Sequence, residues 1–186
     1  MKSNAEILAI LAGMLLFQGV WANEWNVDAE TSRIGFVATY DEIPFEGRFD
    51  EFTALIRFDP ENPSDGSFLI TIGVASVDTD SPDRDEGMLE ADWFDVESHP
   101  QAAFTSLRFE RLSGENEYAV TGDLTIKGIT NSVTATFSWT QADSSVRLKG
   151  SADVERGDFD IGTGDWEDDD TIGFDVRIVF DLTLTQ

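Results

Sequence analysis

Hydrophobic and polar residues alternate along most of the chain after residue 32. Residues i and i+2 of an extended chain lie on the same face, so alternation predicts β-strands that bury one face. In the longest such segment, 172–184, Ile172, Phe174, Val176 and the four later apolar residues share one face. Seven further segments follow the same rule: 33–39, 53–58, 68–74, 103–109, 118–126, 132–140 and 146–154.

The length and the number of these strands predict an all-β fold closed into an antiparallel barrel. The thirteen residues of 172–184 span about 40 Å at roughly 3.3 Å each, which is long for a two-sheet sandwich. About eight such strands favour a barrel, because closure removes exposed sheet edges. The interior of a barrel of this size is filled by side chains or holds one ligand. The predicted bend points are Gly35, Gly47, Gly73, Gly122 and Gly150.

One segment departs from the alternation and predicts a short helical insert at about 81–95. Asp80 or Ser81 is suited to cap the helix, and Pro82 is suited to its first turn. Acidic residues early in the segment are favourable at a helix N-terminus. Met88, Leu89 and Trp93 are expected on its inner face.

The first 22 residues are typical of a secretory signal peptide. An apolar run at 7–17 is followed by Val20-Trp21-Ala22, which fits a small-x-small cleavage site. The run is too short to span a bilayer. We therefore expect a barrel domain at 23–186 that is exported to the periplasm or secreted, without stable membrane insertion.

The charge of the chain excludes one class of function. With 37 Asp and Glu against 12 Lys and Arg, the formal net charge is −25, which repels nucleic acid and anionic membranes. A solvated acidic coat suited to a saline habitat is the favoured interpretation, since salt screens self-repulsion. The alternative is a docking face for a basic partner, which no local clustering of acids along the sequence supports.

The most characteristic stretch is a strand–turn–strand pattern around Gly122–Gly128. Val120, Leu124 and Ile126 face one way, Gly128 marks the turn, and Val133 to Trp139 alternate in a second strand. Read as V-T-G-D-L-T-I-K-G-I-T, this hairpin resembles the YceI-like family of secreted bacterial proteins. Weaker similarity covers Trp25–Asp28, Ser32–Phe36, Phe45–Phe49 (as a G-x-F turn), Val77–Asp95, Pro100–Ser106 and Arg156–Gly162.

The resemblance implies a lipocalin-like barrel that encloses an isoprenoid lipid as a binding or carrier protein, without catalysis. The aromatic content of the chain agrees with an apolar cavity, although its fourteen phenylalanines are equally compatible with a packed core that holds no ligand. The expected ligand-binding residues are Phe36, Met88, Phe94, Phe104, Phe137, Phe174, Ile178 and Phe180, with Met88 and Phe94 closing a mouth.

The head group of such a lipid is expected to be a quinone rather than a phosphate. A phosphate needs cationic or backbone donors, and only Lys127 and Lys149 remain as lysines after processing. Nine arginines also remain, and convergence of Arg33, Arg48, Arg84 or Arg156 at a barrel mouth keeps a polyprenyl phosphate as the alternative. A quinone needs one or two hydrogen-bond donors. Tyr40, Arg48 and Arg84 are the candidate head-group residues, and Tyr40 stands near where family members often carry a histidine.

Catalytic and metal-binding patterns are weak. His99 is the only histidine and the chain has no cysteine, so neither a zinc site nor a Ser-His-Asp triad is indicated. The acids at 78–85 lack the frame of a calcium loop. We expect no catalysis, no metal and no cofactor besides the bound lipid, in a monomer or homodimer. The alternative function is a ligand-free, stress-related or protein-interaction module with an acidic, salt-adapted surface.

Overall fold

The computed structural model describes residues 24–142 and 144–186. The predicted signal peptide at 1–22 lies outside them and stays a prediction. Within the described residues, eleven strands form one antiparallel sheet, accompanied by one α-helix and four short 3-10 turns. The strands are β1 (Glu24–Val27), β2 (Arg33–Tyr40), β3 (Ile43–Phe49), β4 (Phe52–Arg57), β5 (Ser67–Gly73), β6 (Val77–Asp78), β7 (Gln101–Arg111), β8 (Glu117–Ile126), β9 (Ile129–Ala142), β10 (Ser145–Glu155) and β11 (Asp175–Thr185).

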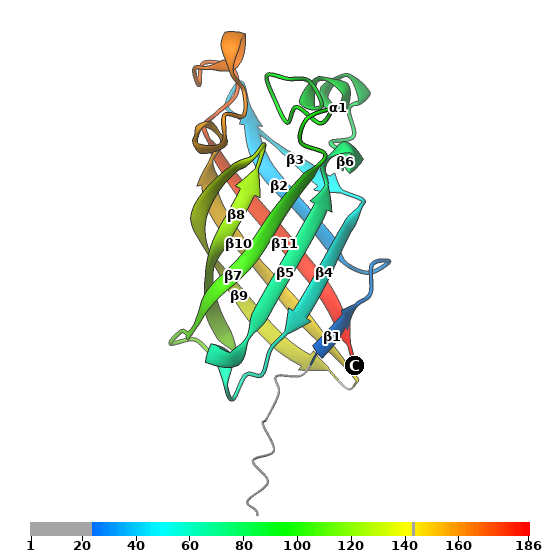
Figure 1. Ribbon diagram of the computed structural model, residues 1–186, viewed down its shortest axis with the longest axis vertical. Coiled ribbons are helices and arrows are strands. Elements are labelled where there is room, and N and C mark those ends of the chain that lie inside the picture. The colour runs from blue at the N-terminus through cyan, green and yellow to red at the C-terminus, as the bar shows by residue number, and fades with distance from the viewer. Residues whose placement is uncertain (1–23, 143) are drawn as a thin grey trace, which may run out of the picture.

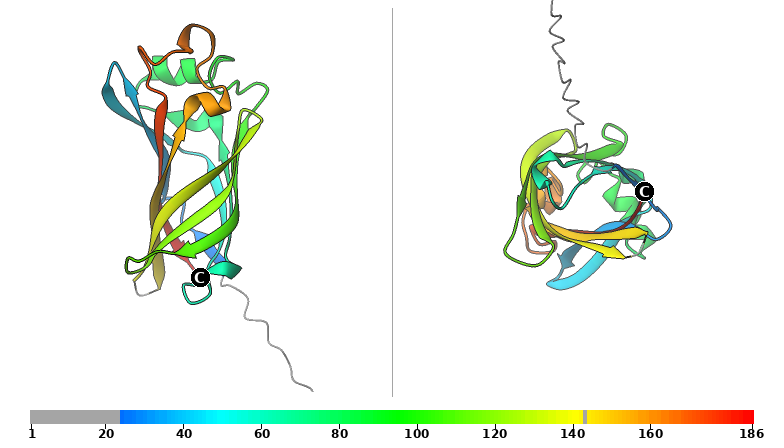
Figure 2. Two further views of the ribbon diagram at one scale, coloured as in Figure 1. Left: turned by 90° about the vertical axis from the view of Figure 1, so that its left-hand side faces the viewer. Right: turned by 90° about the horizontal axis from the view of Figure 1, so that it is seen from below.

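The sheet closes on itself into a barrel (Figures 1 and 2). Eight strands complete the ring in the order β1-β4-β5-β7-β8-β9-β10-β11, because β1 pairs with both β4 and β11. The long β11 pairs with β1 near its C-terminal end, at Val27↔Leu184, and with β2 further up, at Phe36↔Ile178. Strands β2, β3 and β6 continue the wall at the other end of the barrel. The predicted eight-stranded antiparallel barrel is therefore confirmed.

The stretch 45–49, expected as a turn, lies inside strand β3. Glu46 is exposed, while its neighbours Phe45 and Gly47 are more buried and Phe49 is partly buried, so the segment follows the strand alternation. Pro44 precedes it and pairs only with Thr39 of β2 in the described sheet. Proline is tolerated there because its missing N–H falls on an unpaired strand edge.

The helical insert is shorter than the 81–95 expected from the sequence. Helix α1 (Pro82–Met88) begins with proline in its first turn, as predicted, and residues 89–98 form hydrogen-bonded turns instead of further helix. The Phe94 N–H donates to the Met88 carbonyl at 3.1 Å, which folds the chain back. The Asp85 carboxylate accepts bonds from the Thr79 N–H and hydroxyl, at 2.8 and 2.6 Å, and ties the helix to β6.

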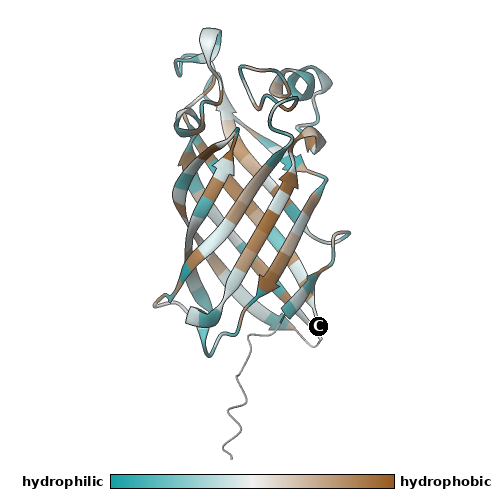
Figure 3. Cartoon of the chain, in the orientation of Figure 1, coloured by the Kyte–Doolittle hydropathy of each residue, from teal (hydrophilic) through white to brown (hydrophobic). Residues whose placement is uncertain are grey.

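Buried side chains form two cores, one at each end of the barrel. Figure 3 shows apolar residues spaced along the strands, with mostly polar loops at the end that carries α1. The closed-end core comprises Trp25, Ile34, Ile56, Phe58, Phe68, Phe109, Tyr118, Val120, Ala135, Phe137, Trp139, Val146, Leu148, Ala152, Leu182 and Leu184. The open-end core comprises Phe36, Ala38, Val74, Val77, Met88, Phe94, Ala102, Leu124, Phe159 and Ile161.

Candidate ligand cavity

The open-end half of the barrel encloses an apolar cavity of about 500 Å³. Its walls come from the inward faces of the strands and from the inner face of α1. It reaches down to Phe68, Val120 and Leu148, which belong to the closed-end core. The polar side chains that line it, Tyr40, Ser81, Asp83, Arg84 and Arg156, come from β2, from the helical insert and from the end of β10. Nearly all of the lining is hydrocarbon, which suits an apolar ligand.

Three phenylalanine–glycine pairs explain why the cavity is not filled. A Cβ built on Gly47 would lie 2.3 Å from Cζ of Phe36, and one on Gly150 would lie 2.6 Å from Cζ of Phe180. Each ring therefore occupies the space that a side chain on the neighbouring strand would take. A Cβ built on Gly122 would lie 2.5 Å from Cζ of Phe104 and 2.4 Å from the Thr105 carbonyl oxygen. The rings rest against the wall, and the centre of the barrel stays free.

Six of the eight predicted ligand-binding residues lie on the wall of this cavity. They are Phe36, Met88, Phe94, Phe104, Ile178 and Phe180. Met88 and Phe94 are 8% and 9% exposed and belong to the open-end core. Met88 is the last residue of α1 and Phe94 lies in the turns that follow it, so both belong to the inner side of the helical insert.

Phe137 does not line the cavity. It points inward, as its position in the alternation requires, but it packs in the closed-end core against Tyr118, with ring centroids 5.5 Å apart, and against Phe58 at 5.4 Å. The alternation of a strand gives the side of the sheet and not the height along the barrel axis. The height depends on strand tilt and register, which place Phe137 opposite Tyr118 of β8.

Phe174 is also misplaced by the sequence pattern. The prediction extended the last strand back to residue 172, but β11 begins at Asp175. Phe174 is 37% exposed and does not line the cavity. Its ring lies 5.0 Å from Cζ of Arg156. The physical reason is that the chain leaves the regular strand at Gly173, whose N–H donates to the carbonyl of Thr39.

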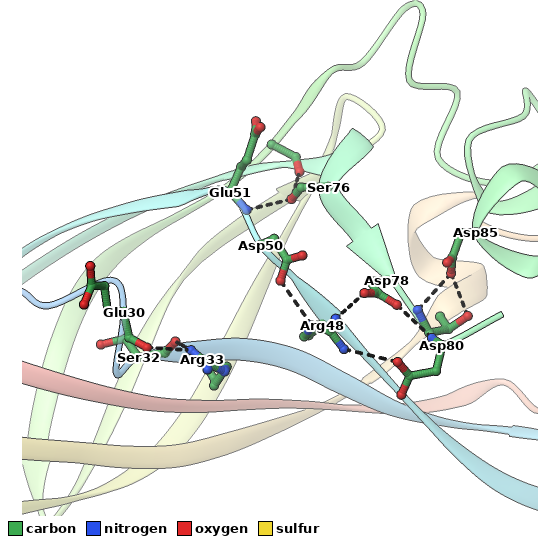
Figure 4. Close-up of polar contacts among 12 residues, drawn as sticks. Glu30, Ser32, Arg33, Arg48, Asp50, Glu51, Ser76, Asp78, Asp80 and Asp85 are labelled. Atoms are coloured by element: carbon green, nitrogen blue, oxygen red, sulfur yellow. Dashed lines mark hydrogen bonds and ion pairs between the residues drawn. The ribbon is translucent and has the colours of Figure 1, made fainter. Parts of the chain in front are cut away.

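Two of the three head-group candidates lie at the mouth. Tyr40 lines the cavity while 44% exposed, and the Arg84 guanidinium lies over the Phe45 ring with Cζ 4.2 Å from its centroid. Arg48 lies on the outer face of β3, because Gly47 and Phe49 on either side of it face inward. There it pairs with Asp50, Asp78 and Asp80 (Figure 4).

Arg156 is the organising residue of the mouth. Its side chain is nearly fully buried, and burial lowers the pKa of its guanidinium, an effect that Asp168 and Asp169 partly oppose. Its N–H groups donate to the carbonyls of Ile161, Gly162, Trp166, Asp168, Ile172 and Gly173. These bonds use all the N–H donors of the guanidinium. Arg156 therefore fixes the loop at 161–173, which lies between β10 and β11, and has no free donor for a ligand. The only sequence signal for this role is its place in the R-x-x-F-x-I stretch.

A clasp joins this loop to the helical insert. The carbonyl of Asp92 accepts bonds from the N–H groups of Gly162 and Thr163, at 2.8 and 2.9 Å. Above it, the rings of Trp93 and Trp166 lie 5.6 Å apart. Both rings line the cavity, so the clasp covers one side of the mouth.

Two other kinds of site are absent from residues 24–142 and 144–186. In this part of the chain, no three His, Cys, Asp or Glu side chains are grouped so that they could hold a metal ion. The same part contains no helix with the length and apolar character needed to cross a membrane.

Comparisons with known proteins agree with this geometry. The YceI-like domain family matches residues 25–184. A UPF0312 protein of Photorhabdus laumondii is 40% identical over 132 residues, which cover 68% of each chain. Further curated relatives, 38–40% identical, are matched over less than half of their length.

Two solved structures show the same barrel. BcnA of Burkholderia cenocepacia superposes with a TM-score of 0.82 at 35% identity, covering 85% of this chain and 99% of that one. A polyisoprenoid binding domain from Saccharophagus degradans gives a TM-score of 0.66 at 15% identity, covering 88% of this chain and 98% of that one. The second likeness shows the fold alone.

Proposed function

The chain belongs to the YceI-like family, and from this membership we propose that the protein binds and carries an isoprenoid lipid in the open-end cavity. The observation that supports the proposal most is the unfilled apolar space above a tightly packed core. A cavity of this kind is a common form of small-molecule site. The polyisoprenoid binding domain with the same fold supports the choice of ligand class.

The energetics of the cavity suit a long hydrocarbon tail. Each methylene transferred from water to an apolar site contributes about 0.8 kcal/mol, so a tail of several isoprene units binds without polar contacts. The six lining residues named above are then tail contacts. The polar groups at the mouth are left to meet the head group.

We infer a quinone-type head rather than a phosphate. Arg84 is the one cation on the lining whose donors are not consumed by the backbone, and it shares the mouth with Asp83. Burying a phosphate beside carboxylates is costly. A quinone is neutral, and the Tyr40 hydroxyl at the mouth is a suitable donor to one of its carbonyl oxygens.

Mass spectrometry of organic extracts tests the ligand class. Purified protein should release an isoprenoid lipid at close to one molecule per cavity, and Gly47→Trp protein should release little. An extract that contains only fatty acids or phospholipids would contradict the proposal.

A displacement experiment tests the head group. Protein loaded with an isoprenoid quinone is titrated with a polyprenyl phosphate of equal tail length at low salt. The quinone should remain bound when the polyprenyl phosphate is present at a concentration well above that of the quinone. Displacement at equal concentrations would show that the phosphate is accepted equally well.

We also propose that the protein acts outside the cytoplasm, after removal of residues 1–22. The apolar run at 7–17 and the Val20-Trp21-Ala22 stretch support this proposal. Fractionation of expressing cells followed by N-terminal sequencing tests it. A mature chain that begins at Asn23 in the periplasmic or culture fraction is expected, and an intact chain in the cytoplasm would contradict it.

A further inference from the structure

Exposed apolar side chains gather around the mouth of the cavity. Tyr40 and Trp166 both line the cavity and reach solvent, at 44% and 36% exposure. Ile43 pairs with Tyr40 across the β2–β3 hairpin and is 68% exposed, and Phe174 is 37% exposed on the neighbouring loop. These four residues, the apolar rim, come from segments that meet at the open end of the barrel (Figure 1). An exposed apolar patch that is continuous with a cavity marks a contact surface.

The apolar rim is surrounded by the densest negative charge of the molecule. Three segments at the open end, 41–42, 80–98 and 156–175, carry eighteen Asp and Glu against two arginines, Arg84 and Arg156. One further cation reaches them from the β8–β9 turn, where the Lys127 ammonium donates to the Asp160 carbonyl at 2.8 Å. We call these segments the acidic collar. Eight of these acids lie in 80–98 and eight in 156–175, and the fold brings the two acidic segments together at one end of the barrel.

The charge of the acidic collar is largely uncompensated. Among the described residues, its acids form ion pairs only between Asp80 and Arg48, at 3.6 Å, and between Asp95 and His99, at 3.9 Å. Arg48 also pairs with Asp50 and Asp78 beside the collar, and the remaining ion pairs lie on β-strands along the barrel wall, such as those of Arg147 with Asp181 and of Arg177 with Asp153. The negative field is therefore concentrated where the cavity opens.

We propose that the apolar rim is the docking surface for a partner protein that loads or unloads the cavity, and that this partner presents an apolar patch bordered by Lys and Arg. The inference rests on the proposed lipid-binding function and adds the partner. The rim offers the partner apolar contact beside the mouth, and the acidic collar attracts a complementary basic border. Such complementarity sets the orientation and speeds the encounter. A bilayer with anionic head groups is disfavoured by the same field.

A defined peptide tests the surface. The probe is a synthetic amphipathic helix with a leucine face bordered by lysines, and its control carries glutamate in place of each lysine. Binding to the lipid-loaded protein is measured by fluorescence anisotropy at 50 and 300 mM sodium chloride. The lysine peptide should bind and weaken at least tenfold at the higher salt, and the glutamate peptide should not bind.

Matched variants separate the rim from a general acidic coat. Replacing three exposed collar acids, Asp165→Asn, Glu167→Gln and Asp169→Asn, should weaken peptide binding at least tenfold. Three exposed acids near the other end of the barrel, changed as Glu30→Gln, Glu61→Gln and Glu115→Gln, should change it less than twofold. The apolar contribution is tested by Ile43→Ser, which should weaken binding at least threefold, against Leu55→Ser on the barrel wall, which is 60% exposed and should have no effect.

Three results would overturn the docking surface. They are equal losses in the two triple variants, equal losses for Ile43→Ser and Leu55→Ser, or binding of the wild type to phosphatidylcholine–phosphatidylglycerol vesicles as tight as to the peptide. None of the changed residues lines the cavity, so each variant should hold an isoprenoid quinone as the wild type does. If the wild type binds the peptide but holds no quinone, the lipid-binding proposal is refuted and the docking-surface proposal stands.

Discussion

The two ends of this barrel have the same wall and different contents. At the closed end, Phe58 contacts five other aromatic rings at centroid distances of 4.8 to 6.0 Å, and nothing of its side chain is exposed. At the open end, Phe36, Phe104 and Phe180 lie over glycines and leave a cavity of about 500 Å³ between them. Both ends are built from phenylalanines on inward-facing positions. What differs is the residue that stands beside each ring.

This difference separates stability from binding. A ring packed among other rings stabilises the folded state through the apolar surface that it buries. A ring that lies over a glycine leaves one of its faces open and so forms part of the cavity wall. The closed-end core therefore holds the fold together without a ligand. The open-end half keeps apolar surface available, which a bound tail covers.

The largest predicted effect contrasts one phenylalanine from each end. Phe58→Ala should destabilise the lipid-free protein by about 3–5 kcal/mol, the usual loss for a fully packed ring. Phe104→Ala should cost roughly half as much or less, because one side of its ring already faces the cavity. Urea denaturation of both lipid-free variants measures this, and equal losses would show that the two ends are packed alike.

A smaller effect should follow from filling the space under one ring. In Gly47→Ala, the three atoms nearest to the new methyl group all belong to the Phe36 ring, which must swing into the cavity. Affinity for an isoprenoid quinone should fall about tenfold, or roughly 1.4 kcal/mol. The double variant Gly47→Ala with Phe36→Leu should recover most of the loss. If the double variant binds no better than the single one, the ring is not what blocks the ligand.

The closed-end core contains a buried polar group, the hydroxyl of Tyr118, in otherwise apolar surroundings. The Tyr118 hydroxyl is buried and has no hydrogen-bond partner among the described residues. An unsatisfied buried hydroxyl costs about 1–3 kcal/mol, so Tyr118→Phe should stabilise the protein by about 1 kcal/mol. Lipid affinity should not change. A destabilised variant in the same urea titration would indicate a partner for this hydroxyl.

The smallest predicted effect concerns the outer surface. The hydrogen bond from Arg147 holds the pKa of the Asp181 carboxyl below its ordinary value. Because the folded pKa is depressed, the stabilisation is present above the unfolded pKa, about 3.9, and is lost as the pH falls toward the folded pKa. The pair is partly exposed, so Asp181→Asn should cost only a few tenths of a kcal/mol at pH 7. The cost should vanish in melting experiments at low pH. A loss of more than about 1 kcal/mol in the free energy of unfolding would mean that ion pairs on the outer wall contribute substantially to stability beside the closed-end core.

Alternation predicted the strands well and the cavity less well. The expected segment 118–126 became Glu117–Ile126, and 146–154 became Ser145–Glu155. These boundaries follow from local burial on one face, which the sequence shows directly. Segment 45–49 was missed as a strand because glycine, and proline just before it, are rare in strands. The open edge of β3 accommodates Pro44, and the Phe36 ring that lies over Gly47 accounts for the glycine.

The depth of a residue in the barrel could not be predicted. Phe104 and Phe137 both face inward, yet the first lines the cavity and the second lies in the closed-end core. Their difference comes from tilt and register, which are properties of paired strands and not of one segment. The role of Arg156 was equally out of reach, because its acceptors are backbone carbonyls that the fold brings around it.

Photo-crosslinking tests the central claim, that the open-end half binds an isoprenoid tail and the closed-end core does not. The probe is an isoprenoid quinone with a diazirine at the end of its tail, and the labelled residues are read by peptide mass spectrometry. Labelling is predicted on cavity residues such as Phe104, Leu124 and Ile178, with none on Phe58, Phe137 or Trp139. Labelling confined to exposed Leu55, Leu69 and Leu107 of the outer wall, or spread through the closed-end core, would contradict the account.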